Sequence, residues 1–271
     1  MKNEKKGFSA GGSTTILLIL YLVLPLGFTS LYFIGNMYSP LALFESYNLS
    51  MIAGTLAYMV FMSQFVISSR MRFIERVIPQ DRLLSLHGLT GMILAGLVLV
   101  HFIMKYVLVL RYGGVTLQSA FGALAVFIYA VLAPLAILVL RGRKPRKGGS
   151  PPYEKNRKRH NLFALAGLLV VVHVLLASST WSWPLKITTL AWGLFSLGTY
   201  VRHKMIRPRR AASLVLFDVS PLASDVHQYR FKSESDHRAL TERVSGQFGY
   251  FSFESEVCGT ESHPFTVAAP A

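Results

Sequence analysis

Six long apolar stretches constrain the fold of this chain more than any other feature. They cover residues 15–37, 49–68, 83–110, 120–140, 161–177 and 185–201. An α-helix of about 20 apolar residues crosses the hydrocarbon core of a lipid bilayer, which is about 30 Å thick. The last two stretches are short and need flanking residues to reach that length. The pattern predicts an all-α transmembrane bundle of six helices, with the lipid bilayer as its main partner.

The composition agrees with a membrane protein. Charged residues make up 15% of the 271 residues, whereas a soluble domain carries about 25%. The net charge of +15 raises the question of nucleic-acid binding. The basic residues, however, lie in short blocks between apolar stretches rather than on one globular face. We therefore expect no nucleic-acid partner, and the single cysteine, Cys258, excludes a disulfide framework and a cysteine metal site.

Lysine and arginine alternate between the connections and predict the orientation. Residues 1–14, 69–82, 141–159 and 202–210 are strongly basic, whereas the connections between them hold few charges. Basic connections face the cytoplasm. We therefore expect both termini to be cytoplasmic in a multi-pass protein of the plasma membrane, with the first stretch retained rather than cleaved as a signal peptide.

The composition changes after Pro208. Residues 212–220 and 246–253 are rich in aromatic and β-branched side chains and are separated by polar turns, a pattern typical of β-strands. The chain therefore divides into a cytoplasmic tail (1–14), a transmembrane domain (15–207) and a short, incomplete β segment (208–271).

Four histidines lie within or at the edge of the apolar stretches, where each is a functional-site hypothesis because ionisable groups are costly in lipid. His87 and His101 belong to the third stretch, and His160 and His173 to the fifth. At a rise of about 1.5 Å per residue, the first two are roughly 21 Å apart and the second two roughly 20 Å apart. Because both stretches run outward from the cytoplasm, we expect His87 to meet His160 near the inner face and His101 to meet His173 near the outer face.

Two imidazoles on opposite sides of an iron make a low-spin haem suited to electron transfer. The depth-matched histidines thus predict two b-type haems stacked across the bilayer. The alternative is that they are hydrogen-bonding or interfacial residues, which two matched pairs make less favourable. His203, His227 and His237 lie outside the stretches and are interpreted as surface residues.

The two histidines of the third stretch lie on one face of an ideal helix, whereas the two of the fifth stretch do not. At about 100° per residue, His87 and His101 lie within roughly 40° of each other, whereas His160 and His173 differ by about 140°. A helix distortion near Gly167 is one way to bring the second pair onto one face.

The two histidine segments resemble a known family. Residues 86–102 begin Leu-His-Gly-Leu-Thr-Gly and end Leu-Val-His-Phe, and residues 159–174 begin Arg-His-Asn-Leu-Phe-Ala and end Val-Val-His-Val. They resemble the haem helices of the ferric reductase and NADPH oxidase superfamily, and the histidine spacings of fourteen and thirteen match the NADPH oxidase pattern. The resemblance implies that His87 and His160 hold the inner haem iron and that His101 and His173 hold the outer one.

A second motif lies in the β segment. Gly-Gln-Phe at 246–248 and His-Pro-Phe-Thr at 263–266 resemble two strands of the family's FAD domain, of the ferredoxin-reductase type. The resemblance implies that His263, Pro264, Phe265 and Thr266 bind FAD; the alternative is an ordinary strand end. The sequence stops at Ala271, before the family's pyrophosphate-binding turn and its NAD(P)H domain. The FAD site is thus partial in this chain alone, and we expect either a truncated chain or a separate cytoplasmic reductase domain or subunit that supplies NAD(P)H electrons.

The leading hypothesis is an oxidoreductase of the ferric reductase or NAD(P)H oxidase type. Electrons would pass from a cytoplasmic flavin through the inner and outer haems to ferric iron, oxygen or a protein outside. Arg82, Lys158 and Arg159 flank the inner ligands and are candidate partners of haem propionates, or alternatively of lipid phosphates. Two rival functions remain: a non-catalytic dihaem membrane subunit that relays electrons to or from a partner protein, and a transporter or scaffold without haem.

Overall fold

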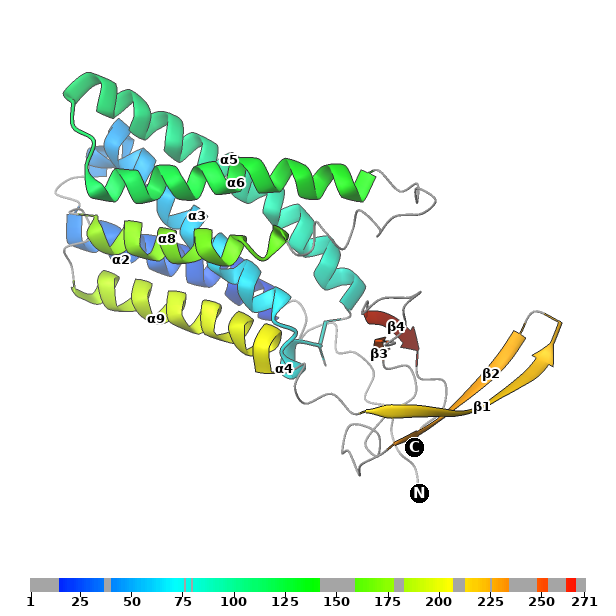
Figure 1. Cartoon of the computed structure of the whole chain (residues 1–271). Helices are drawn as coiled ribbons and strands as arrows, with labels where there is room; N and C mark the ends of the chain where they lie inside the picture. The colour runs from blue at the N-terminus through cyan, green and yellow to red at the C-terminus, as the bar shows by residue number, and fades with distance from the viewer. Residues whose placement is uncertain are drawn as a thin grey trace. The chain divides into compact units, whose positions relative to one another are not determined.

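A computed structural model describes residues 15–36, 40–75, 77–78, 80–141, 159–177, 183–206, 213–224, 226–233, 248–252 and 262–266. The chain divides into two compact units, Met1–Met205 and Ile206–Ala271. Figure 1 shows that the described part of the first unit is helical and that of the second consists of strands.

The first unit is built from helices, three of which have non-α geometry. In chain order they are η1 (Ile19–Val23), α2 (Leu24–Asn36), η2 (Pro40–Phe44), α3 (Ser46–Ser68), α4 (Arg72–Glu75), α5 (Gln80–Tyr112), α6 (Leu117–Arg141), α8 (Phe163–Leu176), α9 (Trp183–Val201) and η4 (Arg202–Ile206). η1 and η4 are π-helical and η2 is a 3-10 helix. η4 leads from α9 across the boundary between the two units.

Four of the described helices are long and apolar enough to cross a bilayer: Thr15–Ile34, Ser46–Ser68, Arg82–Tyr112 and Leu117–Leu135. α8 is a shorter apolar helix of 14 residues. The expectation of a mostly helical membrane protein is therefore confirmed, whereas the number of six spans stays a prediction.

α3 is the central helix of the bundle. It packs against α2, α5, α8 and α9, while α8 also packs against α6 and α9, so that α6, α8 and α9 lie side by side in Figure 1. Within their most apolar windows, 83% of α3 is buried but only 6% of α5. A helix that is apolar on every side is buried in a core or faces lipid. α3 is buried in the core, and most of α5 is on the surface of the bundle.

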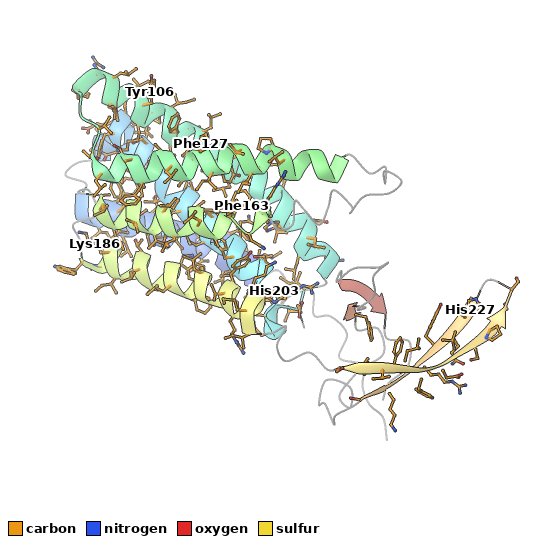
Figure 2. The ribbon with its side chains drawn as sticks, viewed as in Figure 1. Tyr106, Phe127, Phe163, Lys186, His203 and His227 are labelled. Carbon is orange, nitrogen blue, oxygen red and sulfur yellow. The ribbon has the colours of Figure 1, made fainter. Side chains whose placement is uncertain are left out.

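Large apolar side chains cover the outer faces of α5 and α6. Leu99 of α5 is 57% exposed and Phe127 of α6, labelled in Figure 2, is 66% exposed. An apolar surface of this extent is not tolerated in water. It is the surface that a lipid bilayer covers.

Tyrosine hydroxyls tie the helices together in the core. Tyr58 in α3 donates to the carbonyl oxygen of Thr189 in α9 at 2.6 Å. Tyr129 in α6 donates to the carbonyl oxygen of Gly91 in α5 at 2.9 Å, and Tyr32 in α2 donates to Asn48 Oδ1 in α3 at 2.8 Å. Because apolar burial does not hold helices together in lipid, such interhelical bonds contribute to association.

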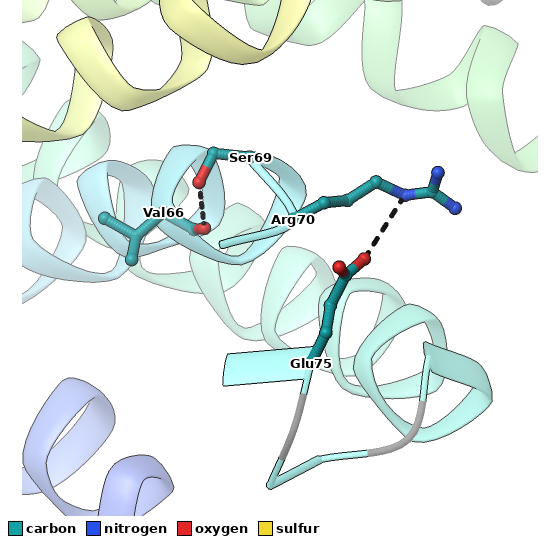
Figure 3. Close-up of polar contacts among 4 residues, drawn as sticks. All are labelled: Val66, Ser69, Arg70 and Glu75. Atoms are coloured by element: carbon teal, nitrogen blue, oxygen red, sulfur yellow. Dashed lines mark hydrogen bonds and ion pairs between the residues drawn. The ribbon is translucent and has the colours of Figure 1, made fainter. Parts of the chain in front are cut away.

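A tight turn ends α3 and sends the chain toward α5 (Figure 3). The Ser69 hydroxyl donates to the carbonyl oxygen of Val66 at 2.7 Å. Arg70 follows with a φ of 50°, in the left-handed conformation that commonly stops a helix. Its side chain forms an ion pair with Glu75 of α4, with Nε and Oε1 3.9 Å apart.

The described residues of the second unit form two antiparallel strand pairs. β1 (Leu214–Ala223) pairs with β2 (Val226–Ser233), and β3 (Phe248–Ser252) pairs with β4 (Ser262–Thr266). β1 and β3 cover most of the two segments that the sequence predicts as strands. Irregularities in the β1–β2 register fall between Leu216 and Asp218 and between Pro221 and Ala223, where β-bulges increase the local twist.

Candidate functional site

Two pairs of histidines face each other across the helix bundle. The ring centroids of His87 and His160 are 6.0 Å apart, with the planes at 63°. Those of His101 and His173 are 6.3 Å apart, with the planes at 81°. His87 and His101 lie on α5, His173 lies on α8, and His160 precedes α8. The structure thus brings together the members of each pair that the sequence matches by depth.

The ring separations can be compared with those in a bis-histidine metal site. An imidazole nitrogen binds a first-row metal ion at about 2.0–2.1 Å, and a nitrogen lies about 1.1 Å from the centre of a ring with bonds of about 1.35 Å. An iron between two imidazoles therefore separates the centroids by about 6.3 Å. Both pairs have this separation within about 0.3 Å. Since aromatic rings in simple contact also lie about 4.5–7 Å apart, the ring nitrogens decide what the pairs can do.

The nitrogens of the outer pair are arranged as in a metal site. His101 Nδ1 donates to the carbonyl oxygen of Ser50 in α3 at 2.6 Å. His173 Nδ1 donates to the carbonyl oxygen of Gln118 in α6 at 2.8 Å. Because a carbonyl only accepts, Nδ1 carries the proton in each ring and Nε2 keeps its lone pair. Metal-binding histidines are oriented in this way by backbone carbonyls.

A cavity of about 910 Å³ surrounds the outer pair, at the upper end of the range of about 300–1,000 Å³ for ligand pockets. Its wall combines α3, α5, α6 and α8, with Phe61, Leu94 and Tyr129 among the apolar lining residues. Lys105, one turn after His101, also lines it and places Nζ 3.7 Å from the centroid of the Tyr47 ring. An apolar cavity with two facing imidazoles fits a flat metal-bound macrocycle such as haem.

One ring nitrogen of the inner pair, His87 Nδ1, is buried. Within the part of the chain that the structure describes, His87 Nδ1 is buried and has no hydrogen-bond partner. Buried polar atoms without a partner are rare and call for an explanation. A bound group that takes up a ring nitrogen of His87 and turns the ring would supply one. The His160 ring contacts the Phe163 ring, with centroids 4.8 Å apart, and Phe163 also contacts Tyr129 at 5.6 Å.

A turn between His160 and α8 changes the angle between the two histidines of this segment. Asn161 and Leu162 form a turn before α8 begins at Phe163. The amide of Leu162 bonds to the carbonyl of Arg159 at 2.9 Å, and that of Leu165 to Leu162 at 3.0 Å. These are bonds to the third preceding residue, as in a 3-10 helix, so the angle of about 140° for an ideal helix does not apply.

The distortion lies at the turn rather than near Gly167, which the sequence offers only as one position where a distortion would bring the two histidines onto one face. Gly167 is inside regular helix α8, and a Cβ there would lie 2.9 Å from Cε2 of Phe65 and 3.1 Å from Cδ2 of Leu197. Gly167 therefore permits close packing of α8 and does not break it. Asn161 is the signal in the sequence for the true position, because asparagine favours turns, and its Oδ1 accepts a hydrogen bond from Tyr200 at 2.8 Å.

The remaining predicted site residues are described only in part. Arg82 near the start of α5 and Arg159 beside His160 are both exposed, and Lys158 lies outside the described residues. His263, Pro264, Phe265 and Thr266 fall within β4, of which the structure describes the backbone; Thr266 pairs with Phe248 and His263 with Phe251. Among the described residues there is no cluster of three or more His, Cys, Asp or Glu that could hold a metal ion, a criterion that a pair of histidines does not meet.

Comparison with protein families matches residues 53–185 to the family described as "Ferric reductase like transmembrane component". The matched segment begins within α3, ends within α9 and contains all four histidines. A comparison with curated proteins finds no match.

Proposed function

Because residues 53–185 place the chain in the ferric reductase-like transmembrane family, we propose that it carries electrons across the membrane through two stacked b-type haems. The observation that carries the proposal is the pair of facing histidine couples, with ring centroids 6.0 and 6.3 Å apart. Haem iron supplies a one-electron couple when it is bound. His87 and His160 would hold the inner iron, and His101 and His173 the outer iron.

Two histidine ligands on each iron determine the kind of chemistry. An iron held by the two histidines of a pair would have imidazole as both of its protein ligands, a set that suits electron transfer rather than substrate binding at the metal. Apolar residues of the outer cavity, including Phe61 and Leu94, would pack against a bound haem. His87 and His101 are fourteen residues apart on α5, a rise of roughly 21 Å, which divides one long crossing into shorter steps.

The direction of transfer is from the cytoplasm outward. The basic connections support six spans with both termini cytoplasmic, in the plasma membrane. Electrons would enter from a flavin at the cytoplasmic face, held by residues 263–266 of this chain or by a separate reductase domain or subunit that oxidises NAD(P)H. Arg82, Lys158 and Arg159 would pair with the inner propionates, and the acceptor outside is ferric iron, oxygen or a protein.

A dithionite-reduced minus oxidised spectrum with pyridine-haemochrome quantitation tests this proposal. We expect two low-spin b-type haems per full-length chain in detergent. Each of the variants His87→Ala, His101→Ala, His160→Ala and His173→Ala should retain one, because a single histidine leaves the iron with half of its protein ligands. His227→Ala, at an exposed position of β2, should retain both. A colourless protein from haem-replete cells would overturn the proposal.

A further inference from the structure

Two glycines on different helices have the same relation to the two outer histidines. A Cβ built on Gly54 of α3 would lie 2.7 Å from both Cε1 and Nδ1 of His101 and 3.4 Å from its Cγ. A Cβ on Gly122 of α6 would meet the same three atoms of His173 at the same three distances. Real Cβ atoms essentially never approach closer than 3.0 Å, so each imidazole occupies the space that a side chain would need.

The hydrogen bonds of the two rings follow the same repeat. The carbonyl that accepts from His101 Nδ1 belongs to Ser50, four residues before Gly54, and the one that accepts from His173 Nδ1 belongs to Gln118, four residues before Gly122. Residues four apart lie one above the other on the same face of a helix. Each ring therefore lies over the bare backbone of the glycine while its Nδ1 reaches the carbonyl one turn earlier.

We propose, on the basis of the function proposed above, that Gly54 and Gly122 are positioning residues that seat the outer-haem ligands His101 and His173. A small residue lets the ring approach the helix backbone closely enough to bond to it. That bond fixes the ring orientation and leaves Nε2 free for iron, and it raises the basicity of the ligand. Gly54 and Gly122 thus control both the retention and the midpoint potential of the outer haem.

Other glycines of the bundle have different neighbours. A Cβ on Gly193 would lie 2.7 Å from Cγ2 of Val171 and 2.8 Å from the hydroxyl of Tyr58, and Gly167 faces Phe65 and Leu197 as described above. These two permit helix packing. Gly88, Gly91 and Gly96, on the same helix as His87 and His101, have no heavy atom within 4 Å of an added Cβ. At Gly54 and Gly122, in contrast, the three nearest atoms all belong to one imidazole.

The test uses the full-length chain with the substitutions Gly54→Ala and Gly122→Ala. Haem content, the low-spin ferric EPR signals and a redox titration are measured for each. We expect the outer haem either to be lost, from two haems per chain to one, or to be retained with a shifted EPR signal and a raised midpoint potential. The potential rises because a ligand without its Nδ1 hydrogen bond donates less to ferric iron. The inner haem serves as an internal control and should be unchanged.

Two matched variants distinguish an effect on the position of the imidazoles from an effect on helix packing. Gly96→Ala adds the same methyl group to α5 in open space, and should leave both haems as in the wild type. Gly167→Ala should lower the stability of the bundle without shifting the outer-haem signal, since its new Cβ meets Phe65 and Leu197.

Three results would overturn the seating role: an outer-haem signal and potential that stay unchanged in both Gly54→Ala and Gly122→Ala, loss of both haems together, or an equal outer-haem shift in Gly167→Ala. Absence of haem from the wild-type chain would instead refute the proposed function itself. The two failures are therefore distinguishable.

Discussion

The two nitrogens of each outer histidine have separate tasks. Nδ1 is bonded to a main-chain carbonyl, of Ser50 for His101 and of Gln118 for His173, so Nε2 is the nitrogen that is available to a metal. A main-chain acceptor is present whatever side chain the residue carries. The orientation of the two rings therefore depends on the helix backbone and on the glycine one turn later, not on the side chains of Ser50 and Gln118.

Because ring orientation depends on the backbone carbonyl, we predict different haem contents for substitutions at Gln118 and at His173, which share a hydrogen bond. Gln118→Ala removes a side chain but keeps the carbonyl that accepts from His173 Nδ1, so both haems and their spectra should be retained. His173→Ala should lose the outer haem. Pyridine-haemochrome quantitation on the two purified variants checks this. Loss of a haem in Gln118→Ala would show that the side chain, rather than the backbone, matters at this position.

The sequence reveals the histidines of the site but not the residues that orient them. A histidine inside an apolar stretch is conspicuous because it is costly in lipid, and four of them can be paired by helical rise. Gly54 and Gly122 are two of 21 glycines, and the role of a glycine depends on what lies against it. For both Gly54 and Gly122 that neighbour is an imidazole more than forty residues away in sequence. No local sequence pattern therefore identifies either glycine as a positioning residue.

At the scale of elements, apolarity predicts helix positions well and helix ends less well. The stretch at 49–68 corresponds to α3 (Ser46–Ser68), and that at 83–110 to α5 (Gln80–Tyr112). The helices extend beyond the apolar residues because backbone hydrogen bonding continues into polar flanks. α5, with 33 residues, is about 50 Å long, so it is longer than the hydrocarbon core is thick.

The pattern of apolar residues does not predict the turn after His160. Helix periodicity describes a continuous helix, whereas the change of direction here depends on backbone bonds at Asn161 and Leu162 and on a hydrogen bond from a different helix. The angular mismatch between His160 and His173 indicated that a distortion was needed, and it did not indicate where. Gly167 was the wrong location because its small size serves packing against Phe65.

The same turn leads to a prediction about the inner haem. Tyr200→Phe keeps the aromatic ring, which contacts Phe65, but removes the hydroxyl that donates to Asn161 Oδ1. We expect the EPR signal of the inner haem to shift and its retention to weaken by no more than about tenfold. The loss should stay at the low end of the 10–100-fold effects of outer-shell groups on metal sites, because Tyr200 acts through Asn161 rather than on His160 directly.

The control for Tyr200→Phe is Tyr229→Phe, which alters an exposed tyrosine of β2. It should change neither haem. Equal shifts of the inner and outer signals in Tyr200→Phe would mean that the hydroxyl supports the whole bundle rather than the turn beside His160.

At the scale of the whole molecule, the outer site joins four helices. α5 packs on α3, and α8 packs on α6. In each of these two pairs, one helix provides the histidine and the other provides the glycine and the carbonyl. The two pairs meet where His101 faces His173. A metal held between these rings would link the α3–α5 pair to the α6–α8 pair.

The orientation of this assembly in the membrane yields the last prediction, because it would set the direction of electron flow in the proposed function. Two single-cysteine chains, each in a Cys258→Ser background, report on opposite faces. Val115→Cys lies between α5 and α6 at a position 82% exposed, and Ser150→Cys lies in the basic connection between α6 and α8. Since basic connections stay in the cytoplasm, a membrane-impermeant maleimide should label the first in intact cells and the second only after permeabilisation. The opposite labelling would place His101 and His173 on the cytoplasmic side, and electrons from a cytoplasmic donor would then meet that pair first.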